Sequence, residues 1–495
     1  MDIDVRTQQG VVRGRMVEGV ATFKGIPYAA PPFGANRFQP PRPVERWDGV
    51  REALSYGPTV PKPPYFPPFD VLIPEPAIPG EDCLNLNIWT PDVGRAGLPV
   101  MVWIHGGAFS NGSGAVPQYD GSRFARDGVV CVTINYRLGV DGFLYLGDGI
   151  ANLGLLDQVA ALAWVQENIA AFGGDSDNVT IFGESAGAFS VSTLLSMPRA
   201  WGLFRRVIAQ SGAGHHVISP ATAQRVGQYL AEKLGVEATS EAIAAVPVDR
   251  LLQAQVELSG DAFANPDPVR WGEVAGNLMP FEPVIDGDIL PTRPIDSIVG
   301  GAGAGVDVII GTNTDEEMLF MVPNGAINYI TEDMLAGTVA AYGLPVSETI
   351  ATYRAIRPDA SAGELLSAIV TDWFFRIPAI RLAEAHAQST GATYMYEFAW
   401  RSPGFDGKLG ACHGLEIPFV FDTLDKEGFE VLLGDDAPQQ LADAMHAAWV
   451  AFAKVGDPGW QRFDLSRRAT MRFDTTQKLV EDPRSAERLL WEGLR

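Results

Sequence analysis

The chain has little cysteine and no long apolar run. Its 495 residues include only Cys83, Cys131 and Cys412, an odd number whose spacing suits neither a disulfide framework nor a metal site. No segment approaches the roughly 18 consecutive apolar residues that a membrane-spanning helix needs. The opening MDIDVRTQQG lacks the apolar stretch of a secretory signal. We therefore expect a cytoplasmic protein without a membrane span.

Positive charge is also scarce. Lysine and arginine number 37 against 60 aspartates and glutamates, a formal net charge of −23. Such a surface repels phosphate backbones and anionic lipid, which argues against nucleic-acid binding and favours neutral or cationic small molecules. The acids are scattered rather than gathered into a tail, which is typical of a surface that serves solubility. The sequence does not determine the oligomeric state, and a monomer is slightly favoured.

Apolar residues make up 46% of the chain, and short β-branched runs alternate with longer helical patterns. Several runs are continuously apolar, as strands buried on both faces are. This alternation predicts an α/β fold, a mainly parallel sheet flanked by helices. The predicted strands are Asn85–Trp89, Val100–Ile104, Val129–Ile134, Val179–Phe182, Arg206–Ala209, Val306–Ile310 and Thr393–Phe398.

The remaining segments complete a single predicted domain over residues 1–495. Residues 11–29 indicate an antiparallel hairpin, whereas residues 152–174 and 438–454 have the apolar spacing of helices. Residues 221–300 and 315–390 are mostly helical and loop-like, and we interpret them as insertions that cap the sheet. No linker separates domains.

A proline-rich stretch interrupts this pattern. Residues 58–79 hold nine prolines, with Tyr65, Phe66 and Phe69 between them. A stiff loop of this kind is either a surface excursion or a wall over a functional site. The two interpretations have about equal support from the residues.

The most informative segment is NVTIFGESAGAFSVSTLL. An apolar strand leads directly into Gly183-Glu184-Ser185-Ala186-Gly187 and then into a helical pattern. This is the G-x-S-x-G nucleophile elbow in its strand–turn–helix context. We predict that Ser185 is the nucleophile and that the Ala186 N–H donates to the developing oxyanion.

Small residues follow the predicted strand 100–104 in the run His105-Gly106-Gly107-Ala108-Phe109. Consecutive small residues free their N–H groups to point at one spot, where the tetrahedral intermediate of acyl transfer becomes negative. We predict that Gly107 and Ala108, together with Ala186, form the oxyanion hole.

The general base must be a histidine, and triad partners in this fold follow the serine in the order acid, histidine. The six histidines are His105, His215, His216, His386, His413 and His446. Of the late ones, His386 and His446 lie within helical patterns. His413 lies in a glycine-flanked loop after the predicted strand 393–398, so elimination leaves His413.

The acid should also follow a late strand. VDVIIGTNTDEEM supplies Asp315, Glu316 and Glu317 side by side, and the residues alone do not choose among the three.

The ordered motifs resemble the type-B carboxylesterases, the α/β-hydrolase family that includes cholinesterases and bacterial p-nitrobenzyl esterases. The resemblance spans nearly the whole chain through GVATFKGIPYAAPP, RFQPPRPVERW, EDCLNLNIWTP, WIHGGAF, TINYRLG, IFGESAG, GTNTDEE and HGLEIPFVF. It implies an α/β-hydrolase fold with a helical cap. The family's triad acid matches Glu316, and its oxyanion donors match Gly107 and Ala108.

The chain departs from the family pattern in two places. Secreted members pair the cysteine matching Cys83 with one in the loop before it, but residues 57–82 contain no cysteine. Cholinesterases carry a choline-binding tryptophan in that loop, and this chain has none there. The resemblance therefore implies a free Cys83 and argues against cholinesterase activity.

Four further residues lie near the predicted site. Glu184 precedes the nucleophile and is expected to be buried and hydrogen-bonded. A direct catalytic role is disfavoured, because a negative charge there opposes the oxyanion. Ser211 matches a family serine near the triad, and its expected role is support for Glu316 or His413 or, equally, plain packing. For His215 and His216 we favour an ordinary loop role over a place in the acyl pocket.

The sequence therefore predicts a cofactor-independent serine carboxylesterase that forms an acyl-enzyme on Ser185. The substrate would be a small neutral ester, with a short acyl or an aryl group. The alternative is a carbamate or amide hydrolase with the same triad. A non-catalytic adhesion domain would lack the serine, and no ligand spacing supports a metal-dependent hydrolase.

Overall fold

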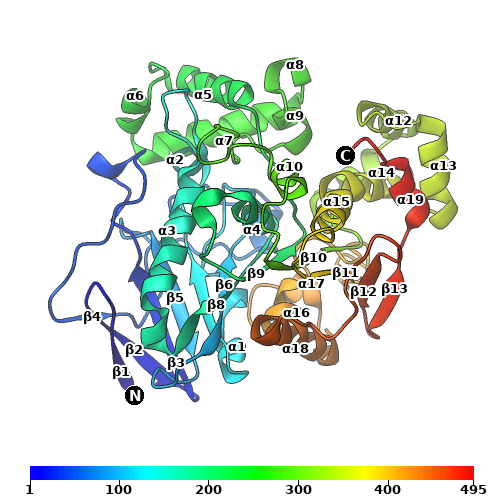
Figure 1. Ribbon diagram of the computed structural model, residues 1–495. Coiled ribbons are helices and arrows are strands. Elements are labelled where there is room, and N and C mark those ends of the chain that lie inside the picture. Colours follow the sequence, from blue (N-terminus) through cyan, green and yellow to red (C-terminus); the bar gives the residue numbers. More distant parts are fainter.

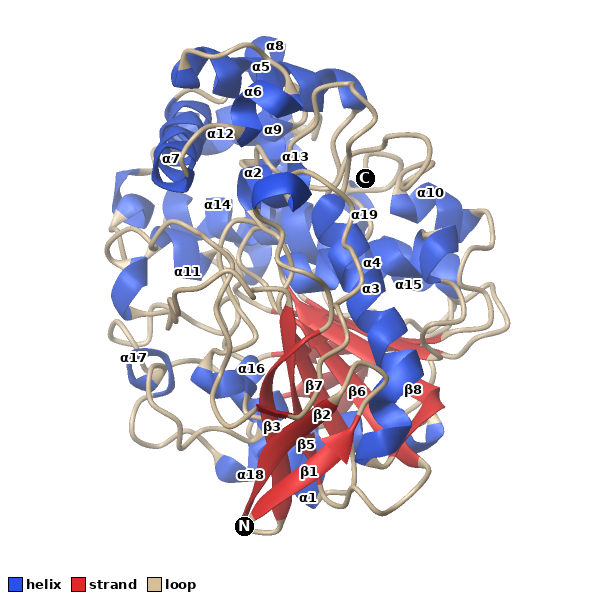
Figure 2. Ribbon diagram, turned by 90° about the vertical axis from the view of Figure 1, so that its left-hand side faces the viewer, coloured by secondary structure: helices blue, strands red, loops and turns tan.

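The computed structural model describes residues 1–495 and is built around one 13-stranded sheet (Figures 1 and 2). The strand order is β1-β2-β3-β5-β7-β6-β8-β9-β10-β11-β12-β13, with β4 paired to β2 at one edge. The strands are β1 (Asp2–Arg6), β2 (Val11–Val17), β3 (Val20–Pro27), β4 (Val50–Glu52), β5 (Asn85–Thr90), β6 (Leu98–Ile104), β7 (Val130–Ile134), β8 (Gly174–Glu184), β9 (Arg206–Gln210), β10 (Asp307–Asn313), β11 (Thr393–Phe398), β12 (Ala469–Phe473) and β13 (Lys478–Glu481).

The centre of the sheet is parallel from β7 to β12, as predicted. The strands toward both edges pair antiparallel, except that the short β4 is parallel to β2. Strands β2 and β3 form the hairpin predicted for residues 11–29. All seven predicted strands are present, with ends that differ by a few residues. Four further strands, β1, β4, β12 and β13, were not predicted, because they are short and carry charged residues.

The central strands are buried on both faces, and their alternating side chains enter two different cores. On β6, Val100, Val102 and Ile104 join one core, whereas Met101 and Trp103 join the other. This period of two is that of a β-strand. It explains why the sequence shows continuous apolar runs with no polar alternation.

Helices cover both faces of the sheet. Contacts place α3, α4 and α15 on one face and α1 and α18 on the other. The helices are α1 (Ser122–Arg126), α2 (Gly139–Phe143), α3 (Leu153–Asn168), α4 (Ala186–Ser196), α5 (Pro220–Leu234), α6 (Ser240–Ala244), α7 (Val248–Ala264), α8 (Pro268–Trp271), α9 (Val274–Asn277), α10 (Pro294–Val299), α11 (Met318–Met321), α12 (Glu332–Ala341), α13 (Val346–Ile356), α14 (Ala362–Thr371), α15 (Ile377–His386), α16 (Ile417–Phe421), α17 (Glu430–Leu433), α18 (Gln439–Val455) and α19 (Ser485–Leu490).

The two segments interpreted as cap insertions are helical. Residues 221–300 contain most of α5 and all of α6–α10, and the α5–α9 group lies above the sheet in the view of Figure 1. Residues 315–390 contain α11–α15, with α12–α14 at the upper right. Both segments contribute side chains to the larger apolar core, for example Leu258 and Leu365.

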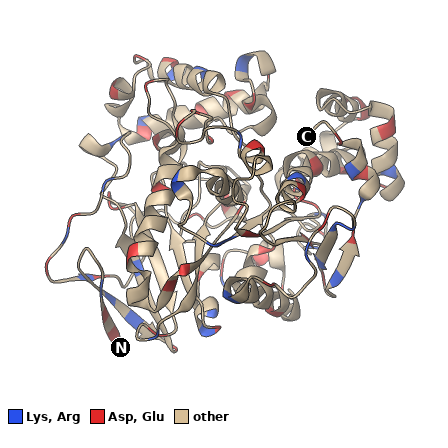
Figure 3. Ribbon diagram, viewed as in Figure 1, with Lys and Arg blue, Asp and Glu red and all other residues tan.

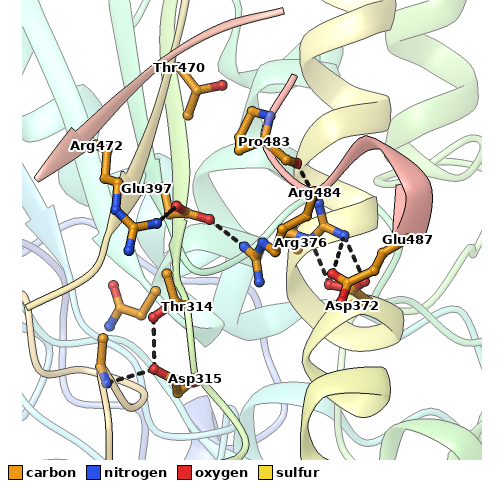
Figure 4. A network of polar contacts seen from close by, with 12 residues as sticks. Thr314, Asp315, Asp372, Arg376, Glu397, Thr470, Arg472, Pro483, Arg484 and Glu487 are labelled. Carbon is orange, nitrogen blue, oxygen red and sulfur yellow. Dashed lines mark hydrogen bonds and ion pairs between the residues drawn. The ribbon is translucent and has the colours of Figure 1, made fainter. Parts of the chain in front are cut away.

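A buried ionic network holds one turn of this second segment. Between α14 and α15 the chain forms a π-helical turn, Asp372–Arg376. Arg376 donates two hydrogen bonds of 2.6 and 2.7 Å to Asp372, and it also lies 3.4 Å from Glu487 on α19 (Figure 4). Breaking a buried pair of this kind costs about 3–5 kcal/mol. The network therefore fixes the turn against the C-terminal part of the chain.

The surface agrees with the scattered charge of the sequence. Acidic residues are distributed over many helices and loops rather than gathered on one element (Figure 3). The three cysteines are buried, and none forms a disulfide. No helix has both the length and the apolar character needed to cross a membrane.

Candidate active site

The predicted nucleophile lies at the sharp turn between β8 and α4. Ser185 has φ 56° and ψ −123°, a conformation that costs a non-glycine residue energy. The serine is partly exposed, whereas its neighbours on both sides are buried. Ser185 N–H donates to Gln210 O at 2.9 Å, which ties the turn to β9. The strand, the turn and the helix are thus arranged as the motif requires.

The predicted oxyanion loop lies directly over this turn. A Cβ added to Gly106 would lie 3.1 Å from Ser185 Cβ and 2.8 Å from Glu184 O. Gly107 and Ala108 have φ of 113° and 52°, and their N–H groups donate to no protein acceptor. Ala186 begins α4, so its N–H has no intrahelical acceptor. The three predicted donors are therefore free beside Ser185.

His413 is distant from Ser185 in the sequence but lies close to the same turn in the structure. It lies in the loop after β11, buried, with its Nδ1 2.7 Å from Glu316 Oε2. Its Nε2 lies 3.1 Å from Glu184 Oε1, and Glu184 immediately precedes Ser185. The imidazole thus stands at the elbow and is oriented by Glu316. No hydrogen bond joins Ser185 Oγ to His413, whose two ring nitrogens lie beside Glu316 and Glu184.

Glu316 is the acid that the fold brings to His413. It follows β10 and is fully buried, and its Oε1 accepts a 2.8 Å hydrogen bond from Asn313 N–H. Its two neighbours make other hydrogen bonds. Asp315 accepts from Ala411 N–H at 3.0 Å and so holds the loop that leads to His413. Glu317 N–H bonds Thr371, and burial raises the pKa of the Glu317 carboxyl to about 8.

Glu184 and His413 form a buried acid–base pair. Burial favours the neutral form of the imidazole, but the carboxylates of Glu184 and Glu316 outweigh it and raise the pKa of His413 above its ordinary value. Burial also raises the pKa of the Glu184 carboxyl. The expectation that Glu184 is buried holds, but Oε1 has no well-aligned hydrogen bond and instead faces the imidazole.

Sequence reasoning missed a polar network behind the histidine. Glu416 is fully buried, accepts from Asn313 Nδ2 at 2.7 Å and accepts from Gln210 Nε2 at 3.1 Å. Asn313 Nδ2 also donates to Cys412 O at 2.8 Å. The network therefore ties the ends of β9 and β10 to the loop of His413. The available signal was an acid, Glu416, inside the apolar run HGLEIPFVF.

The proline-rich stretch 58–79 lies against the oxyanion loop. Glu75 accepts from Gly112 N–H at 3.2 Å and pairs with Lys62 at 3.0 Å. Asn111 Nδ2 donates to Pro63 O at 2.6 Å. Phe69 lies 6.3 Å from Phe320, whose ring is 5.4 Å from His413. These contacts favour the interpretation of this loop as a wall of the site over that of a surface excursion.

The other predicted residues lie apart from these contacts. Ser211 is buried, but its hydroxyl bonds neither Glu316 nor His413, so the structure gives it no supporting hydrogen bond. His386 bonds Thr393 at 2.8 Å, and His446 bonds Val420 O at 2.8 Å. No group of three or more His, Cys, Asp or Glu side chains is arranged to hold a metal ion.

Comparison with known proteins connects this geometry to a family. The model of the carboxylesterase family matches residues 2–490. The chain belongs to the carboxylesterase family. This confirms the resemblance found in the motifs, and the protein is a carboxylic-ester hydrolase that acts on small-molecule esters.

Individual relatives of this esterase match over almost their whole length. Para-nitrobenzyl esterase of Bacillus subtilis is 39% identical over 98% of this chain and 97% of its own. Phenmedipham hydrolase of Pseudarthrobacter oxydans is 34% identical over 97% and 95%. A carboxylesterase structure from Geobacillus stearothermophilus has a TM-score of 0.86 and 40% identity over 99% and 100%. The predicted α/β-hydrolase fold is confirmed.

Proposed function

We propose that the esterase hydrolyses neutral carboxylic esters with a short acyl or aryl group through an acyl-enzyme on Ser185. The observation that carries the proposal is the position of His413, between Glu316 at 2.7 Å and the elbow residue Glu184 at 3.1 Å. An imidazole oriented by a carboxylate beside a partly exposed serine is the arrangement of a serine hydrolase.

The reaction then has two halves. Ser185 Oγ bonds to the ester carbonyl carbon while its proton passes to His413, and Gly107, Ala108 and Ala186 N–H groups donate to the oxyanion. The C–O bond breaks, and the alcohol leaves with the histidine's proton. Water next loses a proton to His413 and attacks the acyl carbon, after which Ser185 regains the proton and the acid departs.

Apolar rings and acidic groups support a neutral substrate. The rings of Phe320 and Phe375 lie 5.4 and 4.8 Å from His413. Glu184 and Glu316 lie on either side of the imidazole, so an anionic substrate would meet negative charge as well as apolar surface. A small uncharged ester, such as a p-nitrophenyl ester, fits both features.

Labelling with a neutral organophosphate tests the nucleophile. We expect stoichiometric loss of activity and one adduct, on the peptide that contains Ser185, mapped by mass spectrometry. An adduct on another residue, or inactivation without an adduct, would contradict the proposal.

A comparison of the rates with a p-nitrophenyl ester and with the matching N-methyl carbamate separates the ester assignment from the carbamate alternative. We expect the carbamate to turn over far more slowly.

The variant Glu184→Gln should change the pH profile. Because the Glu184 carboxylate raises the pKa of His413 and the base must be neutral to act, wild-type activity should rise with pH through a value above the ordinary histidine range. Removing that charge lowers the pKa of His413, so the acidic limb of kcat/KM moves to lower pH. A pKa that falls by one also means about 1.4 kcal/mol less stabilisation of the imidazolium, which lowers the plateau rate about tenfold.

The matched control is Glu282→Gln. Glu282 is another fully buried glutamate, bonded by Asn277 Nδ2 at 2.8 Å and not paired with His413. Its profile should keep the wild-type acidic limb. An unchanged limb in Glu184→Gln would show that this carboxylate does not set the pKa of the base.

A further inference from the structure

His216 is a buried histidine beside the nucleophile that the mechanism does not use. It lies in the loop after β9, and this loop packs on the elbow. A Cβ added to Gly212 would lie 2.8 Å from Ser185 O and 2.6 Å from Ala188 Cβ. The loop therefore brings His216 to the beginning of α4, where the acyl-enzyme would form.

Two aromatic rings pack against the imidazole of His216. Phe189, one turn along α4 from Ser185, stacks on it with centroids 4.1 Å apart and planes at 26°. Phe374 packs against it in a tilted arrangement, with centroids 4.2 Å apart, and the centroids of the two phenylalanine rings are 6.1 Å apart. Phe374 belongs to the π-helical turn that the Asp372–Arg376 network anchors (Figure 4). The imidazole is thus packed against both rings.

The polar atoms of this ring have no partner in the protein. His216 is 1% exposed, and neither Nδ1 nor Nε2 has a hydrogen-bond partner. Each of the other buried histidines bonds at least one protein group, those residues being His105, His386, His413 and His446. An unsatisfied buried donor or acceptor costs about 1–3 kcal/mol, and native proteins rarely keep one without a role.

The ring is also a neutral hydrogen-bonding group. Burial and the nearby Arg495 and His215 keep the pKa of His216 well below its ordinary value. A neutral imidazole offers one N–H donor and one acceptor. It therefore suits an uncharged oxygen rather than a carboxylate or a cation.

The position along α4 indicates which part of the substrate reaches His216. The leaving alcohol must stay near His413 Nε2, which receives and returns the proton. The acyl group stays bonded to Ser185 at the beginning of α4. Phe189 N–H donates to Ser185 O at 2.8 Å, so the stacked pair is one helical turn away, about 5.4 Å. An acyl chain that extended along this turn would bring its fourth or fifth atom to this distance.

We propose that His216 determines acyl specificity by donating a hydrogen bond to an oxygen within the acyl chain. The inference rests on the proposed acyl-enzyme mechanism and adds a substrate class, esters of short oxygenated acids such as alkoxy acids. For His216 this proposal replaces the preference for an ordinary loop role, because its ring stacks on Phe189, one turn along α4 from Ser185.

The test compares pairs of p-nitrophenyl esters of equal length. 3-Methoxypropionate and pentanoate differ by one oxygen in place of a methylene, as do 4-methoxybutyrate and hexanoate. The ratio of kcat/KM within each pair is measured for wild type and for His216→Phe, which keeps the stack and removes both nitrogens. Intrinsic reactivity cancels between enzymes. We expect at least one methoxy/alkyl ratio to fall about three- to tenfold in the variant, the value of one hydrogen bond.

Controls separate this role from packing and from failure of the mechanism. His216→Leu removes the nitrogens without adding volume and should lower the same ratio, which covers poor folding of the first variant. His446→Phe makes the same change at a buried histidine 4.4 Å from Phe124, beyond the opposite face of the sheet, and should leave the ratio unchanged. Equal ratios in wild type and both His216 variants would overturn the inference alone. A wild type that hydrolyses none of the four esters would overturn the proposed function with it.

Discussion

Replacing Ser185 by alanine should lower kcat/KM for p-nitrophenyl acetate by about 10⁴- to 10⁶-fold. The variant keeps the oxyanion donors and the rings of Phe320 and Phe375 near His413, so a small rate above that of the reaction in water should remain. Because the serine and the histidine act together, His413→Ala should cost about as much, and the double variant little more. Steady-state rates at equal concentrations of purified, folded enzyme give the comparison.

The control for this series is Ser192→Ala. Ser192 is a buried serine two turns along the same helix, and its hydroxyl has no hydrogen-bond partner. Its loss should change kcat/KM by less than about twofold, because no catalytic contact is removed. If Ser185→Ala kept activity within about tenfold of wild type, the nucleophile would have to be another residue.

The second large effect is expected for Gly187→Ala. A Cβ at this position would lie 1.9 Å from Ile104 O and 3.0 Å from His105 O. Both oxygens belong to the backbone at the end of β6, just before the oxyanion loop. The overlap must therefore be relieved by moving the elbow or the oxyanion donors. A displacement of about 1 Å costs roughly 10²-fold in rate, so kcat/KM should fall at least that far.

Helix propensity acts in the opposite direction but is too small to compensate. Alanine within a helix is worth about 1 kcal/mol over glycine, whereas overpacking costs about 1–3 kcal/mol, and more against a rigid backbone. Gly260→Ala supplies the matched case, since Gly260 is exposed on α7 and a Cβ there meets nothing within 4 Å. It should raise Tm slightly and leave kcat/KM unchanged. A Gly187→Ala enzyme with wild-type rate would refute the packing argument.

The elbow and the strands were predictable because their causes are local. The apolar run before Ser185, the two flanking glycines and the helical pattern after it require the same strand–turn–helix wherever they occur. The strand Thr393–Phe398 was predicted with the ends that the structure has. Strands β12 and β13 carry charged residues and lack an apolar pattern that would predict a strand. They form because β12 pairs with β11 and β13 pairs with β12.

The sequence by itself determined the nucleophile's turn, the parallel core and, through the family motifs, Glu316 as the expected acid. Only the tertiary structure decided which side chains meet. It turned Glu316 rather than Asp315 toward His413, placed Glu184 on the other side of the imidazole and left Ser211 without a bond. Backbone conformation follows from neighbours in the chain. Side-chain direction between β8, β10 and the loop after β11 depends on how strands far apart in sequence align.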